Sequence, residues 1–189
     1  ISSGRSVALI REGKARGADI HAEATPHHLG MTEDDVLTFG VNARMNPPLR
    51  TESDRQALIA GLVDGTIDMI ATDHAPHTAE QKNRPFGQSM SGITGLETAF
   101  SVCNSALVQT GRVTPMQLIR AMSQNPAQFY GLTGKAVAEG NRAELMIADW
   151  NAEAVYTQYK SKSSNTPFTG LPLCGKVCGI VCGTYCTVN

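Results

Sequence analysis

The chain has 189 residues, 41% of them apolar and 17% charged, with a formal net charge of −1, a composition typical of soluble globular proteins with a sizeable core. The 16 basic residues are scattered and no apolar stretch approaches the roughly 20 residues that span a bilayer, so we expect neither nucleic acid nor membrane as a partner. Five cysteines do not suggest a secreted disulfide framework, and we predict a cytoplasmic, reduced protein.

The first two predicted elements are a helix and a strand. Apolar residues recur at helical spacing over 6–17, and Gly17 can end this helix in the left-handed conformation. Residues 18–25 then alternate moderately between apolar and polar side chains, which predicts a strand. Pro26 stops that strand because the residue before a proline is restricted and proline donates no hydrogen bond.

Two adjacent histidines, His27 and His28, follow directly. Neighbouring side chains on an extended chain point to opposite sides, so we do not expect both histidines to bind one metal ion. We expect them instead to shape the rim of a pocket and to form hydrogen bonds there.

Two prolines mark the next segment of interest. Acidic residues over 32–35 predict a helix N-terminus, and a polar connection follows. Pro47 and Pro48 then hold the backbone extended, which presents Asn46 rigidly. The Asn46 amide can donate and accept hydrogen bonds at once, although an Asx turn before the prolines is an alternative reading. A further helix is predicted over 51–63.

The central prediction concerns an apolar run over 66–71 and the residues after it. The run predicts a buried strand, and Asp73 follows its carboxyl end. Pro76 prevents the strand from continuing, so Asp73 and His77 lie on either side of a turn and can face one pocket. In α/β barrels the loops at this rim carry the chemistry. The alternative is that Asp73 caps a turn and His77 is an ordinary loop histidine.

The string Ala-Thr-Asp-His-Ala-Pro-His from Ala71 to His77, with Lys82 five positions later, resembles the signature of dihydroorotases, the cyclic amidohydrolases of pyrimidine synthesis. In that family the aspartate is a metal ligand and the proton shuttle of a zinc-centred ring hydrolysis, and the second histidine helps to hold the substrate. The resemblance therefore implies a catalytic and metal-binding role for Asp73 and a substrate-binding role for His77.

The stretch over 78–92 shows no apolar periodicity, and a loop of this length usually acts as a lid or a binding loop. Its end, Ser-Gly-Ile-Thr-Gly-Leu-Glu from Ser91, resembles the dihydroorotase segment whose backbone meets the substrate ring. The resemblance implies substrate binding by Ser91 and Gly92, and Gly92 is favoured because many relatives carry an aromatic residue where Ser91 stands. The Asn-Pro-Pro-Leu-Arg string gives Asn46 the same implied role.

The remaining chain predicts helices followed by strands. Helical periodicity covers 96–108, and Thr114 and Pro115 begin another helix. The segment 140–150 resembles the return of the family's chain to a small β-domain, and the β-branched residues over 176–189 predict paired strands.

Four cysteines recur every four residues near the end of the chain, at Cys174, Cys178, Cys182 and Cys186. On one unbroken strand all four would share a face, spread too far apart to converge on a zinc ion. We expect them to be small buried apolar residues rather than metal ligands.

The predicted fold class is α/β: the C-terminal part of a (β/α)8 TIM-type metallo-dependent hydrolase barrel over 1–135, followed by part of a small β-sandwich over 136–189. In the family a zinc-binding histidine stands immediately before the equivalent of Ile1, so we expect this chain to be the C-terminal segment of a longer enzyme. The alternative is a small protein with a processed N-terminus. Asp73 would supply one ligand to one or two Zn2+ ions, and the other ligands would lie upstream of Ile1.

The implied reaction is the reversible hydrolysis of (S)-dihydroorotate to N-carbamoyl-L-aspartate, with this segment inactive alone. One alternative is a related ring amidase, such as a hydantoinase, a dihydropyrimidinase or an allantoinase. The other is a non-catalytic dihydroorotase-like subunit that scaffolds aspartate transcarbamoylase. The expected partners are a small-molecule substrate, the N-terminal part of the same enzyme, and either a second copy of the chain or aspartate transcarbamoylase.

Overall fold

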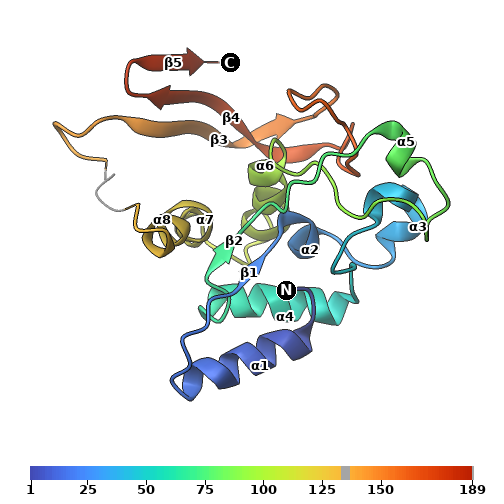
Figure 1. Ribbon diagram of the computed structural model, residues 1–189. Helices are drawn as coiled ribbons and strands as arrows, with labels where there is room; N and C mark the ends of the chain where they lie inside the picture. The colour runs from blue at the N-terminus through green and yellow to red at the C-terminus, as the bar shows by residue number, and fades with distance from the viewer. Residues whose placement is uncertain (133–136, 189) are drawn as a thin grey trace.

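The computed structural model describes residues 1–132 and 137–188. Helices surround a short pair of parallel strands in one region, and a three-stranded antiparallel sheet forms the other (Figure 1). The predicted domain boundary at 135/136 lies outside the described residues. Among the helices in the described part of the chain, none is long and apolar enough to cross a membrane.

Helices α1 (Gly4–Ala15) and α4 (Glu52–Val63) lie side by side next to the parallel strands (Figure 1). Each helix begins with a hydroxyl cap that satisfies a free backbone N–H, from Ser3 in α1 and Thr51 in α4. On α4, Gly61 allows close approach, because a Cβ atom there would stand 2.9 Å from a Val7 methyl carbon. Both helices were predicted, and both are confirmed.

Strands β1 (Glu23–Ala24) and β2 (Met69–Ile70) pair in parallel, with Ala24 opposite Ile70. They confirm the two predicted strands, but each ladder is shorter than its apolar pattern. In the described chain each of these strands pairs with one neighbour, and the pairing covers only two positions.

Pro26 begins a helix, α2 (Pro26–Gly30), rather than only stopping a strand. Proline is favoured at the first helical position, and the Thr25 hydroxyl caps the turn by accepting the His28 N–H. The expectation that His27 and His28 point to opposite sides was therefore wrong. Both rings are buried on the same turn with centroids 4.6 Å apart.

The loop over 78–92 is also more ordered than predicted. It contains the short helix α5 (Ala79–Lys82), which begins with a reciprocal capping box between Thr78 and Gln81. The apolar pattern missed this helix because its buried residue is a lysine, Lys82.

The other helices pack in two buried apolar clusters, and α3 and η1 contribute to the second one. Their bounds are α3 (Asp35–Phe39), the 3-10 turn η1 (Gly40–Ala43), α6 (Ala99–Cys103) continued by the π-helical turn η2 (Asn104–Val108), and α7 (Pro115–Ile119) continued by the π-helical turn η3 (Arg120–Gln124) and α8 (Asn125–Phe129). In the first cluster, buried apolar residues of α1, α2, α4, η2 and α7 meet those of the two strands and of the segment before β2: Val7, Ala24, Leu29, Leu58, Ile67, Ile70, Leu107 and Leu118.

The antiparallel sheet has the order β3-β4-β5, with β3 (Glu144–Ala154), β4 (Leu173–Cys182) and β5 (Tyr185–Val188). It lies beside α6 (Figure 1) and is joined to the helical region by polar contacts. The Asn104 amide donates to the carbonyls of Trp150 at 2.8 Å and Cys174 at 2.9 Å. These strands confirm the predicted β-structure.

The expected burial of the C-terminal cysteines was wrong. Cys182 and Cys186 are exposed, and Cys174 and Cys178 are half-buried. They do not share one face either, because a register shift leaves Cys178 without a paired residue on β3. The hairpin then pairs Cys182 with Tyr185 and Val181 with Cys186, which places Cys182 and Cys186 on opposite faces.

Candidate active site

Asp73 lies three residues beyond the carboxyl end of β2. It is exposed, and its φ of 48° makes it the non-glycine residue in the left-handed region among the described residues. A side chain in this conformation carries strain of roughly 1–3 kcal/mol, and such strain concentrates at functional sites. No hydrogen bond or ion pair engages the Asp73 carboxylate within the described chain, so the group is available to a ligand.

The negative charge of Asp73 affects the pKa values of two neighbouring groups. Burial lowers the pKa of the Ile1 amino group, and the charges of Glu23 and Asp73 oppose that shift. Burial likewise lowers the pKa of His28, and Asp73 is among the groups that oppose it. The charge of Asp73 therefore acts on Ile1, whose amino group donates to the Glu23 carbonyl of β1, and on His28 of α2.

The loop after Asp73 is fixed against the segment that contains Ser91 and Gly92. His77 Nε2 lies 2.9 Å from the Ser91 carbonyl oxygen, and because a carbonyl only accepts, this nitrogen carries the proton. The His77 backbone N–H donates to the Asn165 side chain at 3.0 Å. The Asn165 amide in turn donates to the carbonyls of Ala75 at 3.0 Å and Gly92 at 3.3 Å.

Gly92 occupies a position that only glycine fits well. Its φ is +108°, and a Cβ atom there would stand 2.6 Å from the Ala75 Cβ and 3.6 Å from His77 Nε2. The segments around Ala75 and Gly92 are therefore in direct contact, and a side chain at this point would separate them.

Asn46 and Ser91 line one groove, which has a volume of about 590 Å3. Arg44 and Phe86 also line it, and the Arg44 guanidinium carbon lies 5.9 Å from the centre of the Phe86 ring. The groove thus offers an amide, a cation and an aromatic surface to a small polar molecule. Among the other predicted site residues, His77 reaches the groove only through the Ser91 carbonyl.

The remaining histidines near Asp73 are engaged by the protein. His28 lies 2.7 Å from the Thr25 hydroxyl through Nδ1 and 2.9 Å from the Pro47 carbonyl through Nε2. Burial, followed by the neighbouring His28, lowers the pKa of His27 to about 3, so His27 is neutral in the fold. His74 Nδ1 accepts backbone N–H groups of Gly95 and Leu96, both at 3.2 Å.

Potential metal ligands do not cluster in the described part of the chain. Across residues 1–132 and 137–188, no group of three or more histidine, cysteine, aspartate or glutamate side chains is placed to hold a metal ion. The unpaired, exposed Asp73 carboxylate fits the role of a single oxygen ligand.

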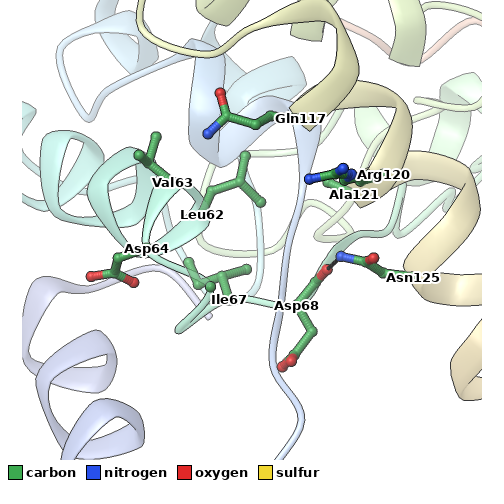
Figure 2. A pocket seen from close by; sticks show the side chains of 10 residues that line it. Leu62, Val63, Asp64, Ile67, Asp68, Gln117, Arg120, Ala121 and Asn125 are labelled. Carbon is green, nitrogen blue, oxygen red and sulfur yellow. Dashed lines mark hydrogen bonds between the residues drawn. The ribbon is translucent and has the colours of Figure 1, made fainter.

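A second hollow of about 280 Å3 lies at the opposite end of β2, between α4 and the helix that runs from α7 to α8. Figure 2 shows the Asn125 amide pointing toward the backbone of Asp68, to whose carbonyl it donates at 2.7 Å. The Asp64 and Asp68 carboxylates that line this hollow are already paired with Arg11 and Lys14. None of the predicted site residues lies there.

Sequence reasoning missed two residues of the candidate site. Asn165 joins His77, Ala75 and Gly92 from between 73 and 90 positions away, so no local pattern indicated it. Lys82 was part of the signature but was given no role, and it is buried beneath the Ser91 segment.

The Amidohydrolase family matches residues 9–183 of this chain. The chain is 49% identical over 177 residues to a dihydroorotase of Clostridioides difficile (strain 630), covering 94% of this chain and 42% of that protein. It is 50% identical over 179 residues to a dihydroorotase of Thermoanaerobacter sp. (strain X514), covering 94% of this chain and 41% of the relative. The chain thus spans about two-fifths of the length of the curated relatives it matches.

Among solved structures, an L-hydantoinase (dihydropyrimidinase) from Arthrobacter aurescens superimposes with a TM-score of 0.93 at 26% identity, over 100% of this chain and 44% of that one. A D-hydantoinase (dihydropyrimidinase) from Thermus sp. superimposes with a TM-score of 0.88 at 24% identity, over 100% and 43% respectively. These likenesses confirm the predicted fold class, a portion of an amidohydrolase barrel of mixed α/β structure.

Proposed function

The chain belongs to the Amidohydrolase family, and from this premise we propose that it is part of a zinc-dependent dihydroorotase that reversibly hydrolyses (S)-dihydroorotate to N-carbamoyl-L-aspartate. The observation that carries the proposal is the unpaired carboxylate of Asp73, a residue with a strained left-handed backbone just beyond the carboxyl end of β2. The identity of about 49% to a dihydroorotase over 94% of this chain supports the choice of substrate. We also propose that the protein acts in pyrimidine synthesis in the cytoplasm. We further propose that its chain divides at 135/136 into a barrel part and part of a β-sandwich.

In the proposed reaction Asp73 holds the proton that moves to the leaving ring nitrogen. A carboxylate suits this task because it can accept a proton from attacking water and return it to the nitrogen. No side chain in the described residues competes for its oxygen atoms. Zinc, when bound, would lower the pKa of water and polarise the ring carbonyl.

Asn46 and His77 are proposed to hold the substrate, with Ser91 and Gly92 contributing backbone groups. The Asn46 amide can pair with the alternating donors and acceptors of a cyclic imide. The Arg44 cation in the same groove favours a substrate that carries a carboxylate, which dihydroorotate has and dihydrouracil lacks.

The described residues offer no group of three or more metal-binding side chains, whereas zinc in proteins takes three or four protein ligands. We therefore propose that the other ligands come from residues outside this chain in the full-length protein. The 189-residue chain by itself should bind no stoichiometric zinc and turn over no substrate. Metal analysis and an assay of the isolated chain check this expectation.

A related ring amidase remains the second candidate function, because the Arthrobacter aurescens hydantoinase superimposes with a TM-score of 0.93. Assaying the full-length protein with dihydroorotate beside dihydrouracil and hydantoin separates the two functions. Preference for dihydroorotate supports the proposal, and preference for an uncharged ring contradicts it. A purely scaffolding subunit is disfavoured because that role does not require an unpaired carboxylate on a strained backbone at Asp73.

A further inference from the structure

Lys82 is a buried cation without a carboxylate partner in the described chain. It ends α5 and is 2% exposed. Its ammonium donates to the carbonyl oxygens of Met90 at 2.9 Å and Gly92 at 3.0 Å. Lysine is almost never fully buried unless it is paired with an opposite charge, because losing water around the ammonium costs free energy. This arrangement therefore calls for a reason beyond packing.

The two carbonyls that Lys82 binds flank Ser91. The carbonyl between them, that of Ser91 itself, accepts the hydrogen bond from His77 Nε2 at 2.9 Å. Three consecutive carbonyls thus point toward one cluster of side-chain donors, in which Asn165 also binds the Gly92 carbonyl. Lys82 bridges the outer two and so fixes the peptide planes on both sides of the Ser91 carbonyl.

This bridge connects Lys82 to the groove and to His77. Ser91 lines the groove that holds Asn46, and the Gly92 N–H donates to the Arg44 carbonyl at 2.9 Å. Rotation of either peptide plane would shift the Ser91 carbonyl and the His77 ring that it orients. A displacement of about 1 Å at a substrate contact can cost on the order of 100-fold in rate.

We propose that Lys82 is a positioning residue for the reaction: its ammonium holds the Met90 and Gly92 carbonyls, and thereby sets Ser91, Gly92 and His77 for substrate. The substrate in this inference is that of the proposed function, on which the inference rests, whereas the geometry comes from the observed hydrogen bonds.

In the described chain, one charged group and one titratable group bear on the ammonium of Lys82 and on the carbonyls that it binds. The charge of Arg44, in the segment before Asn46, acts on Lys82, and His77 binds the Ser91 carbonyl that lies between the two carbonyls held by Lys82. Burial and, secondarily, Arg44 lower the pKa of Lys82 to about 8. Deprotonation leaves a neutral amine whose hydrogen bonds to the two carbonyls are weaker, since hydrogen bonds from a charged donor are roughly twice as strong.

The test compares Lys82→Met and Lys82→Arg in the full-length metal-loaded enzyme. Lys82→Met keeps most of the apolar stem and removes the donor, so kcat/KM should fall about 10- to 100-fold near neutral pH. In the wild type kcat/KM should decline above pH 8, in Lys82→Met this decline should be absent, and in Lys82→Arg it should move to higher pH. Arg84→Met is the matched control, because Arg84 is an exposed cation on the same loop.

The proposal is overturned if Lys82→Met retains wild-type kcat/KM and the wild-type decline above pH 8. If Lys82→Met does not fold, an unchanged decline in Lys82→Arg overturns it instead. Amide hydrogen exchange over 90–93 gives a readout that needs no substrate, and it should accelerate in Lys82→Met but not in Arg84→Met. Faster exchange in an enzyme that ignores dihydroorotate would refute the proposed function while leaving the positioning of this segment intact.

Discussion

The two ends of β2 carry the same side chain in opposite circumstances. Asp68, at the start of the strand, accepts two hydrogen bonds of 2.8 Å from the Lys14 ammonium and one of 2.8 Å from the Ala22 N–H. Asp73, beyond the other end, has no such partner in the described chain and sits in a strained left-handed conformation. The first carboxylate stabilises the fold, and the second is the one that we propose to take part in the chemistry.

This difference follows from how parallel strands are connected. The amino end of β2 meets the chain that arrives from α4, and Asp68 there ties α1 and the start of β1 to the new strand. The carboxyl end opens into loops that carry function in α/β barrels, whereas the opposite rim stabilises. The two ends of β2 should therefore respond differently to substitution.

The substitution Asp73→Asn should have the largest effect, a loss of catalysis. In the full-length enzyme kcat should fall about 10³-fold, because the amide cannot relay a proton. Asparagine tolerates the left-handed conformation, so the melting temperature should stay within the error of the wild type. Steady-state kinetics and thermal unfolding check both halves. Normal turnover by this variant would refute the role of Asp73.

Asp68→Asn should show the reverse pattern. Losing the charge leaves the half-buried Lys14 ammonium without its anion, which should lower the free energy of unfolding by about 1–3 kcal/mol. The kcat/KM of the folded enzyme should change little. Denaturant titration measures the loss, and a double-mutant cycle with Lys14→Met separates the pair from other contacts. A selective loss of activity would break the distinction between the two ends of β2.

Gly92→Ala should disturb the packing of the loops beyond the carboxyl end of β2 and lower activity. The added Cβ would meet the Ala75 Cβ at 2.6 Å with a φ of +108°, so the Ser91 segment must shift. We expect kcat/KM to fall about tenfold, in line with strain of roughly 1–3 kcal/mol. Gly87→Ala is the control on the same loop, because a Cβ there meets nothing within 4 Å. Equal effects of the two substitutions would contradict the close approach of Ala75 and Gly92.

The smallest effect is expected from His77→Ala. Loss of a substrate contact that is equal in the ground and transition states should raise KM about five- to tenfold and leave kcat within about threefold. His21→Ala is the control at the other end, since the His21 ring lies 3.8 Å from the Asp68 carboxylate. If KM rises as much in His21→Ala, the two ends do not divide binding from stability as proposed.

Local patterns in the sequence predicted the elements and the place of Asp73. Helical spacing and the run of apolar residues before Asp73 are local signals, so α1, α4 and β2 were predicted near their observed positions. The signature around Asp73 also indicated the family, because many fixed residue types stand within 12 positions of one another. One local signal was overlooked: Thr78 and Gln81 have capping-box spacing, which indicates α5.

Only the tertiary structure decided how these pieces meet. Asn165 joins His77 to Gly92 across a large sequence separation, and the partners of the buried Lys82 are carbonyl groups, which every residue type carries. A register shift and a hairpin turned the regularly spaced cysteines away from a common face. The physical reason is common to all three cases: side-chain spacing encodes the period of a single element, whereas contacts between distant segments depend on how the backbones approach each other.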